Sequence, residues 1–201
     1  MNCDWIAGWY QTFELLAFGR ALERCRREYL KDVSDARRVL ILGDGDGRFT
    51  AEFLRCNETA QVESIDASAR MIELAQERAG CDRVRFRIGD ARTAEFTGAY
   101  DLVVTHFFLD CFTTEDLDRL IERVTEYCEP DARWLISEFR SPSIAARVLI
   151  RFMYFCFWLT TGITVTRLPE YTDLLTRREF KLQQRQAALR GLLVSELWQR
   201  G

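Results

Sequence analysis

The stretch VLILGDGDGRFTAEFL, which runs from Val39 to Leu54, decides the fold of this chain. Four apolar residues lead into three glycines at alternate positions, two aspartates separate the glycines, and an amphipathic segment follows. Glycine adopts backbone angles with positive φ and lets a ligand approach the main chain closely. A helix that begins after such a loop points its free N–H groups at the same place. The stretch therefore predicts a strand, a ligand-binding loop and a helix.

Length and composition predict one soluble domain. The chain has 201 residues, of which 48% are hydrophobic and 29% are charged, so it can bury a core without disulfides or metals. Its formal net charge of -3 argues against nucleic acid as the main partner, because phosphate binding depends on clustered Lys and Arg. We interpret the run of basic residues between Arg20 and Arg38 as a solvated helix face.

Cysteine usage and the opening sequence predict a cytoplasmic protein without a metal. The seven cysteines include no CxxC pair, and only one histidine could join them at a metal, so a structural zinc site is not expected. We interpret the cysteines as reduced thiols. The opening MNCDWIAGWYQ carries an early acid and no basic-then-apolar pattern, so no targeting segment is expected.

From residue 38 onward the sequence alternates between strands and helices. Strands are expected at 39–42, 62–65, 83–87, 100–105 and 134–139, with helices at 48–55, 68–78 and 114–127. Alternation of this kind predicts a parallel sheet that is covered by helices on both faces and joined by right-handed crossovers. The expected fold class is therefore α/β, with three layers and a doubly wound, mostly parallel sheet.

The two ends of the chain differ from this central part. Residues 6–31 have apolar residues at helical spacing and predict one or two helices before the first strand. The last segment, FKLQQRQAALRGLLVSELWQR, has two runs on either side of Arg190-Gly191. This pattern indicates a hairpin of two long strands, with a helix as the alternative for the glutamine-rich half. We expect a single domain that consists of a helical cap (1–35), a cofactor-binding core (36–140) and an apolar lid helix with the hairpin (141–201).

The two loop aspartates, Asp44 and Asp46, indicate the charge of the ligand. A dinucleotide would bring a pyrophosphate to this loop, and each like-charge contact at about 4 Å would cost about 1 kcal/mol in water and about 4 kcal/mol near a protein surface. S-adenosylmethionine carries a sulfonium and an ammonium group instead, for which a nearby carboxylate is attractive. The alternative is that both side chains face solvent and cap the helix, with Asp46 as the N-cap.

Two further acidic residues fall at the ends of the next strands. Asp66 ends the second strand in VESIDAS, at a distance along the chain where an acid can accept the hydroxyls of a ribose. Gly89-Asp90-Ala91 ends the third strand, where a carboxylate can accept from an adenine amino group and the Ala91 N–H can donate to a ring nitrogen. The structural alternatives are a helix cap at Asp66 and an ordinary turn at Asp90.

Taken together, these motifs resemble the class I S-adenosylmethionine-dependent methyltransferases. The matching segments are VLILGDGDG, SIDAS followed by MIELA, IGDA, and YDLVVTHFFLDCF, within residues 36–139. The resemblance implies a seven-stranded sheet with an antiparallel last strand, S-adenosylmethionine as the cofactor, and packing of Met71 on the adenosine. The candidate cofactor-binding residues are Gly43, Asp44, Gly45, Gly47, Asp66, Ala67, Met71, Asp90, Ala91 and Thr105.

The chain departs from the family pattern at Ile41. The family usually has an acid at this position, two residues before the first glycine, where it helps to hold the methionine end of the cofactor. We hypothesise that Asp44 substitutes for this acid.

The acceptor of the methyl group is expected above the carboxyl ends of the fourth and fifth strands. His106, the only histidine, follows the fourth strand, and Asp110 lies about one helical turn further on. These two are the candidate catalytic residues, with His106 as a base that takes a proton from the acceptor near neutral pH. The alternative is a neutral histidine held by the backbone.

The apolar segment 144–160 has three interpretations. It could form core against the sheet, a lid over an apolar acceptor pocket, or a surface for a membrane or a second subunit in a homodimer. It is too short and too charged to span a bilayer. Aromatic residues near the start of the chain would complete the lid, namely Trp5, Trp9, Tyr10 and Phe13. Their character favours a lipophilic or aromatic acceptor.

The sequence thus favours a cytoplasmic methyltransferase that uses S-adenosylmethionine and a small, apolar or aromatic acceptor, without nucleic acid or metal. A non-catalytic S-adenosylmethionine-binding protein on the same fold is an alternative. An NAD(P)-dependent oxidoreductase is a weaker one, because the loop carboxylates and Gly-Asp-Ala argue against it. A nucleic-acid methyltransferase is weaker still, because the charge is unfavourable and no Asn-Pro-Pro-Tyr-like element follows the fourth strand.

Overall fold

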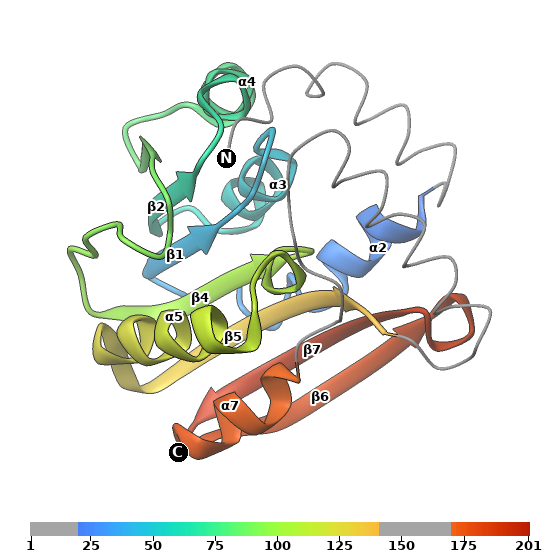
Figure 1. The fold of residues 1–201 in the computed structure, drawn as a ribbon. Helices are drawn as coiled ribbons and strands as arrows, with labels where there is room; N and C mark the ends of the chain where they lie inside the picture. The colour runs from blue at the N-terminus through green and yellow to red at the C-terminus, as the bar shows by residue number, and fades with distance from the viewer. Residues whose placement is uncertain (1–19, 141–169) are drawn as a thin grey trace.

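The computed structural model describes residues 20–140 and 170–201, which share one seven-stranded sheet with helices on both faces (Figure 1). The elements in chain order are α2 (Ala21–Arg27), β1 (Arg38–Leu42), α3 (Arg48–Cys56), β2 (Gln61–Asp66), α4 (Ala69–Ala79), β3 (Val84–Ile88), β4 (Tyr100–His106), η1 (Leu109–Cys111), α5 (Thr114–Glu126), β5 (Cys128–Phe139), α7 (Tyr171–Arg177), β6 (Phe180–Ala188), η2 (Leu189–Gly191) and β7 (Leu193–Arg200). The alternation from β1 to β5 confirms the α/β class expected from the sequence.

The strand order is β3-β2-β1-β4-β5-β7-β6. Strands β1 to β5 pair in parallel, whereas β7 pairs antiparallel with both β5 and β6. The antiparallel last strand is the one that the sequence resemblance implied. The chain moves outward from β1 to β3 and then continues on the other side of β1 with β4 and β5. This reversal makes a switch point at the carboxyl ends of β1 and β4, where ligands bind in doubly wound sheets.

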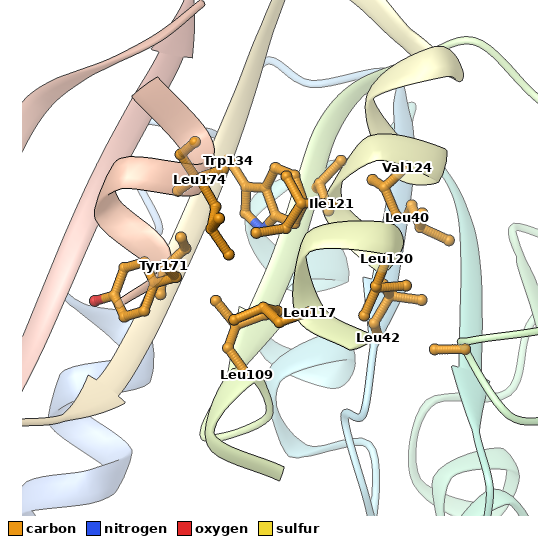
Figure 2. Close-up of a cluster of buried hydrophobic side chains, with 14 of the residues drawn as sticks. Leu40, Leu42, Leu109, Leu117, Leu120, Ile121, Val124, Trp134, Tyr171 and Leu174 are labelled. Carbon is orange, nitrogen blue, oxygen red and sulfur yellow. The ribbon is translucent and has the colours of Figure 1, made fainter. Parts of the chain in front are cut away.

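Alternate residues of the central strands face two separate cores. Leu40 and Leu42 of β1 face a cluster that includes Trp134 and side chains of α5 and α7 (Figure 2). Val39 and Ile41 face a second cluster, to which α3 contributes. Because successive side chains of a strand point to opposite faces, a strand covered on both faces must be apolar throughout. The sequence RVLIL meets this requirement after its exposed first residue.

The C-terminal hairpin confirms the strand interpretation of the last segment. β6 and β7 pair antiparallel and are joined by Leu189, Arg190 and Gly191, which have φ values of 48°, 57° and 86°. Most side chains of β7 are buried, whereas most of β6 is exposed. The glutamine-rich half is therefore a strand rather than a helix, and its polar side chains cover the edge of the sheet.

Much of the expected helical cap and lid falls outside the described residues. Residues 1–19 and the apolar segment 144–160 belong to the ranges that the structure does not describe. In the two described ranges, no helix combines the length and the apolar character needed to cross a membrane. The division of one domain into three parts stays a prediction.

A buried carboxylate in β7 connects the hairpin to α7 and β5. Glu196 has no exposed surface. One of its oxygens accepts from Arg185 Nε at 2.7 Å and from Arg140 Nη2 at 3.1 Å. The other accepts from Trp198 Nε1 at 2.8 Å and from the Tyr171 hydroxyl at 3.2 Å. Four donors therefore satisfy the carboxylate, which is the condition for burying such a charge.

Replacement of Glu196 by Ala is expected to destabilise the fold by about 2–4 kcal/mol, because the buried Trp198 and Tyr171 donors lose their acceptor. Glu126→Ala removes an exposed glutamate of α5 and is the matched control; it should change the free energy of unfolding by less than about 0.5 kcal/mol. Urea unfolding followed by circular dichroism measures both. Similar losses in the two variants would contradict the role of Glu196.

Candidate functional site

Two of the three loop glycines allow other segments to pack against the loop between β1 and α3. A Cβ on Gly43 would overlap the ring of Phe108, which follows β4. A Cβ on Gly47 would lie 2.8 Å from Cα of Ala75 in α4. Both glycines have positive φ, at 72° and 77°. Their main function is therefore to bring the neighbouring segments close, which other residues could not do without strain.

Gly45 differs, because its main chain is open on one side. A Cβ at this position would meet Sδ of Met71 at the ordinary distance of 3.9 Å. The N–H of Gly45 donates to Oδ2 of Asp66 at 3.1 Å, and Oδ1 of Asp66 accepts from the N–H of Ser68 at 2.9 Å. The sequence-predicted residues Gly45, Asp66 and Met71 therefore lie together, with Ala67 partly exposed beside them.

Asp66 joins two loops and still has capacity to accept hydrogen bonds. Its two backbone donors occupy part of the roughly four acceptor positions of a carboxylate. Burial raises the pKa of Asp66, and the hydrogen bonds from Ser68 and Gly45 act against this rise. The N-cap of α4 is Ser68, whose hydroxyl accepts from the N–H of Met71, so the helix-cap alternative for Asp66 is wrong. Ligand binding by Asp66 stays a prediction.

Asp44 turns back onto helix α3 instead of facing solvent. Its Oδ2 accepts from the N–H of Thr50 at 3.2 Å and from the Thr50 hydroxyl at 2.5 Å. Burial raises the pKa of Asp44 to about 6, while the hydrogen bonds of Thr50 and the charge of Arg26 act in the opposite direction. A cation bound nearby would favour the ionised form.

Asp46 does not have the role that either sequence interpretation gave it. The N-cap of α3 is Gly47, without a side-chain cap, so the N-cap alternative for Asp46 is wrong. Asp46 forms ion pairs with Arg48 at 3.0 Å and Arg78 at 2.6 Å. Burial opposes ionisation of Asp46, but the hydrogen bonds and charges of Arg78 and Arg48 outweigh it and lower its pKa. Its charge is therefore compensated within the protein.

Asp90 lies beside the Asp66 loop, where it forms an ion pair. The N–H of Gly89 donates to the carbonyl oxygen of Asp66 at 2.9 Å, which holds the ends of β2 and β3 together. Nε of Arg92 lies 3.0 Å from both carboxylate oxygens of Asp90. These hydrogen bonds lower the pKa of Asp90. A ligand amino group at Asp90 would therefore share the carboxylate with Arg92. The side chain of Ala91 is buried in the core.

The last two residues of β4 face opposite sides of the sheet. Thr105 is fully buried, and its hydroxyl accepts from Nε1 of Trp134 at 3.1 Å. The side chain of Thr105 is thus part of the core, and cofactor binding at this position stays a prediction. His106 faces the other side, with its ring edge-on to Phe49 at 4.6 Å between centroids and its Nδ1 2.9 Å from Oγ of Ser137.

The environment of His106 favours the neutral alternative over the predicted base. Burial, followed by the charge of Arg26, holds the pKa of His106 well below its usual range. An imidazole with a lowered pKa is a poor proton acceptor near neutral pH. Its partner is the Ser137 side chain, however, and not the backbone that the sequence alternative named. Nε2 is buried, and no described residue forms a hydrogen bond with it.

Sequence reasoning missed Glu138, which holds the loop after β4. Oε1 of this buried carboxyl accepts from the N–H of Phe108 at 3.0 Å and of Leu109 at 2.7 Å. Burial, together with the negative charge of Asp110, raises the pKa of Glu138 well above its usual range. The carboxyl thus favours its protonated form more than an exposed glutamate does, and it fixes the loop whose Phe108 ring packs on Gly43.

One sequence signal could have revealed Glu138. It occupies the same face of β5 as Trp134 and Ile136, so strand alternation alone predicts an acid in the core. A buried acid needs hydrogen-bond donors or a proton of its own.

The residues in the described ranges contain no group of His, Cys, Asp and Glu that could hold a metal ion.

The Glu138→Gln variant is expected to be more stable than the parent at about pH 8, with a smaller difference at about pH 5. The raised pKa in the folded state means that the parent loses stability as the pH rises above the ordinary value of 4.5, because only the unfolded chain ionises readily. Glutamine retains the acceptor for Phe108 and Leu109 but does not titrate. Thermal unfolding at both pH values measures this, and a difference independent of pH would contradict the assignment.

Alanine at Gly43 and at Gly45 is expected to have unequal effects on stability. Both positions have positive φ, which costs about 1–2 kcal/mol for a residue with a Cβ. Gly43→Ala adds the overlap with the Phe108 ring, so it should cost about 1–3 kcal/mol more than Gly45→Ala. Chemical denaturation of the two variants checks the order. The reverse order would show that the Phe108 contact does not restrict Gly43.

Comparison with known proteins supports the motif assignment. Residues 39–131 match a family described as a methyltransferase domain. Over 101 residues the chain is 28% identical to a malonyl-[acyl-carrier protein] O-methyltransferase of Priestia megaterium (strain DSM 319 / IMG 1521), an alignment that covers 50% of this chain and 36% of the relative. The matched part is thus about a third of the length of that relative.

Solved structures with the same fold are methyltransferases as well. The N-methyltransferase NodS from Bradyrhizobium japonicum WM9, in complex with S-adenosyl-L-homocysteine, superimposes with a TM-score of 0.69 at 16% identity, over 90% of this chain and 88% of NodS. Magnesium protoporphyrin IX methyltransferase from Synechocystis PCC 6803, also with bound S-adenosyl-L-homocysteine, superimposes with a TM-score of 0.67 at 18% identity. The superposition covers 90% of this chain and 83% of that protein. Residues 39–131 thus match the methyltransferase domain family, and the chain has the fold of these solved methyltransferases.

Proposed function

We propose that the protein transfers the methyl group of S-adenosylmethionine to a small, apolar or aromatic acceptor. The observation that supports this most directly is the convergence of Gly45, Asp66 and Met71 at the carboxyl ends of β1 and β2. Gly45 offers an open main chain, Asp66 can accept ribose hydroxyls, and Met71 offers an apolar surface to the adenosine. These three features suit one nucleoside.

The charges at the loop support a cationic cofactor over a dinucleotide. Burial raises the pKa of the Asp44 carboxyl, so this residue gains from a nearby cation. A pyrophosphate at the loop would add negative charge beside it. Asp46 no longer contributes to this argument, because Arg48 and Arg78 compensate its charge.

The described residues suit a protein that aligns an acceptor with the methyl group of S-adenosylmethionine. S-adenosylmethionine supplies an activated methyl group that leaves its sulfur in an in-line displacement. The protein must orient the acceptor and exclude water. The Phe108 ring, held over Gly43 by Glu138, would provide an apolar surface at the reaction centre. Asp110 stays a candidate on the acceptor side, while the low pKa of His106 argues against a base there.

The class of acceptor is supported by composition and by the range of relatives. Aromatic residues make up 12% of the chain, and many lie in the segments that flank the described core. The similar proteins act on different acceptors, as their names state: malonyl-[acyl-carrier protein] and magnesium protoporphyrin IX. We therefore propose a small acceptor with an apolar or aromatic body.

S-adenosylhomocysteine is expected to stabilise the protein, and NAD is not. Binding to the folded state adds about 2.7 kcal/mol at a hundredfold excess over the dissociation constant. Asp66→Ala should weaken this binding at least about tenfold, because a carboxylate that accepts two ribose hydroxyls is lost. Asp131→Ala, at an exposed position of β5, is the control. Thermal shift and calorimetry measure both effects.

Two results would overturn the proposal. Stabilisation by NAD alone would assign the site to a dinucleotide. Binding of S-adenosylhomocysteine that Asp66→Ala leaves unchanged would remove Asp66 from the site. Transfer of label from methyl-labelled S-adenosylmethionine to a metabolite mixture would separate an enzyme from a binding protein.

A further inference from the structure

An arginine at the end of β5 has hydrogen-bond donors that the described residues do not use. Arg140 follows the last residue of β5, and 33% of its side chain is exposed. Its Nη2 lies 3.1 Å from Oε1 of Glu196, 3.3 Å from the Thr172 hydroxyl and 3.4 Å from the Tyr171 hydroxyl. Arginine also donates through Nε and Nη1. No residue in the ranges 20–140 and 170–201 accepts a hydrogen bond from either atom.

The guanidinium of Arg140 is held in place by α7 and β7. Its Cζ lies 5.3 Å from the ring centroid of Tyr171, the first residue of α7. Figure 2 shows the Tyr171 hydroxyl pointing away from the apolar side chains that surround Trp134. A side chain that is already fixed loses less conformational freedom when it binds a ligand. The unused donors of Arg140 are therefore positioned before any ligand arrives.

The charges around Arg140 leave this end of the sheet positive. Glu196 is shared between two guanidiniums, because Nε of Arg185 lies 2.7 Å from the same oxygen that Arg140 contacts. One carboxylate cannot neutralise two arginines. Glu170 also acts on Arg140, but it is exposed, so water screens its charge. Arg140 therefore suits an anionic group.

A second side chain with an unused polar atom lies on the same face of β5. Residues two apart in a strand point to the same side, which places Glu138 beside Arg140. Oε1 of Glu138 accepts from Phe108 and Leu109, whereas Oε2 is buried and has no hydrogen-bond partner among the described residues. Buried polar atoms nearly always have a partner, so an unpartnered one beside a ligand site points to the ligand.

A bound anion would suit this carboxyl as well as the arginine. Burial and the charge of Asp110 already raise the pKa of Glu138. A further negative charge nearby disfavours ionisation in the same direction. With its proton on Oε2, the Glu138 carboxyl can donate to an anion, while Oε1 keeps its two backbone donors.

The position of the pair relates it to the methyl acceptor. Glu138 fixes the loop of Phe108, whose ring we propose as an apolar surface at the reaction centre. Arg140 follows two residues later, which is roughly 7 Å further along an extended chain. An acceptor that lies on Phe108 would therefore direct its far end to Arg140.

We propose that Arg140 and Glu138 bind a carboxylate group of the methyl acceptor. The pair would select organic acids in which the carboxylate ends an apolar or aromatic body. Arg140 donates through Nε or Nη1, and Glu138 donates through Oε2. The inference rests on the proposed function and specifies the class of acceptor more closely.

Titration with matched acids and amides tests this selection. The probes are benzoate, phenylacetate and octanoate, each compared with its amide, which has nearly the same shape and no charge. Binding is followed by NMR in the presence of saturating S-adenosylhomocysteine. At least one acid is expected to bind about 10-fold more tightly than its amide, as a charge-assisted hydrogen bond predicts.

Matched variants separate ligand binding from support of the fold. Arg140→Gln should reduce the preference for the acid to less than about twofold. Arg185→Gln also removes a partner of Glu196, but from the edge strand β6, and should keep the preference. Arg140→Lys retains the charge and should show an intermediate preference, so it answers the question if Arg140→Gln does not fold. Glu138→Gln retains a donor in place of Oε2 and should keep most of the preference.

The outcomes distinguish this inference from the proposed function. Calorimetry with S-adenosylhomocysteine comes first, and if the parent protein does not bind it, both fail. If the parent binds it, the inference alone is overturned when no acid binds more tightly than its amide. It is also overturned when the preference survives in both Arg140 variants, or when Arg185→Gln removes it equally. Loss of the preference in Arg140→Gln but not in Arg185→Gln supports it.

Discussion

The structure depends on close packing around the main chain of the loop between β1 and α3. Gly43 leaves room for the Phe108 ring, and Gly47 leaves room for Ala75 of α4. Because neither glycine has a Cβ, the loop can contact the segments that follow β4 and β2 at the same time. Gly45 lies between these two contacts and keeps its own surface open. The main chain of the loop is thus covered at Gly43 and Gly47 and open at Gly45.

Most of the fold could be predicted from the sequence, because strands buried on both faces and the turns between them have local signals. The exception is the start of β5, which begins at Cys128 and not at Trp134. Pro130 lies within this strand, although the nitrogen of proline cannot donate a hydrogen bond to a sheet. The register between β4 and β5 shifts between Tyr100 and Leu102, and such an irregularity lets a proline lie within a strand.

The candidate site was predictable only where its residues belong to local motifs. Gly45 follows β1 and Asp66 ends β2, and both lie where these strands place them, so spacing was sufficient to find them. The position of Glu138 depends on contacts between distant segments, which no short motif records. The same holds for the contact of the Thr105 hydroxyl with Trp134, which connects β4 to β5 within the core.

The two aspartates of the loop differ in what they indicate about the charge of the ligand. An aspartate that is compensated by two arginines, as Asp46 is, says nothing about the ligand. Asp44 is different, because burial raises its pKa and ionisation therefore costs free energy in the free protein. A cation beside Asp44 would recover this cost on binding, whereas a pyrophosphate would increase it. The preference for a positively charged ligand thus depends on the desolvation of one carboxyl, and not on the number of aspartates in the loop.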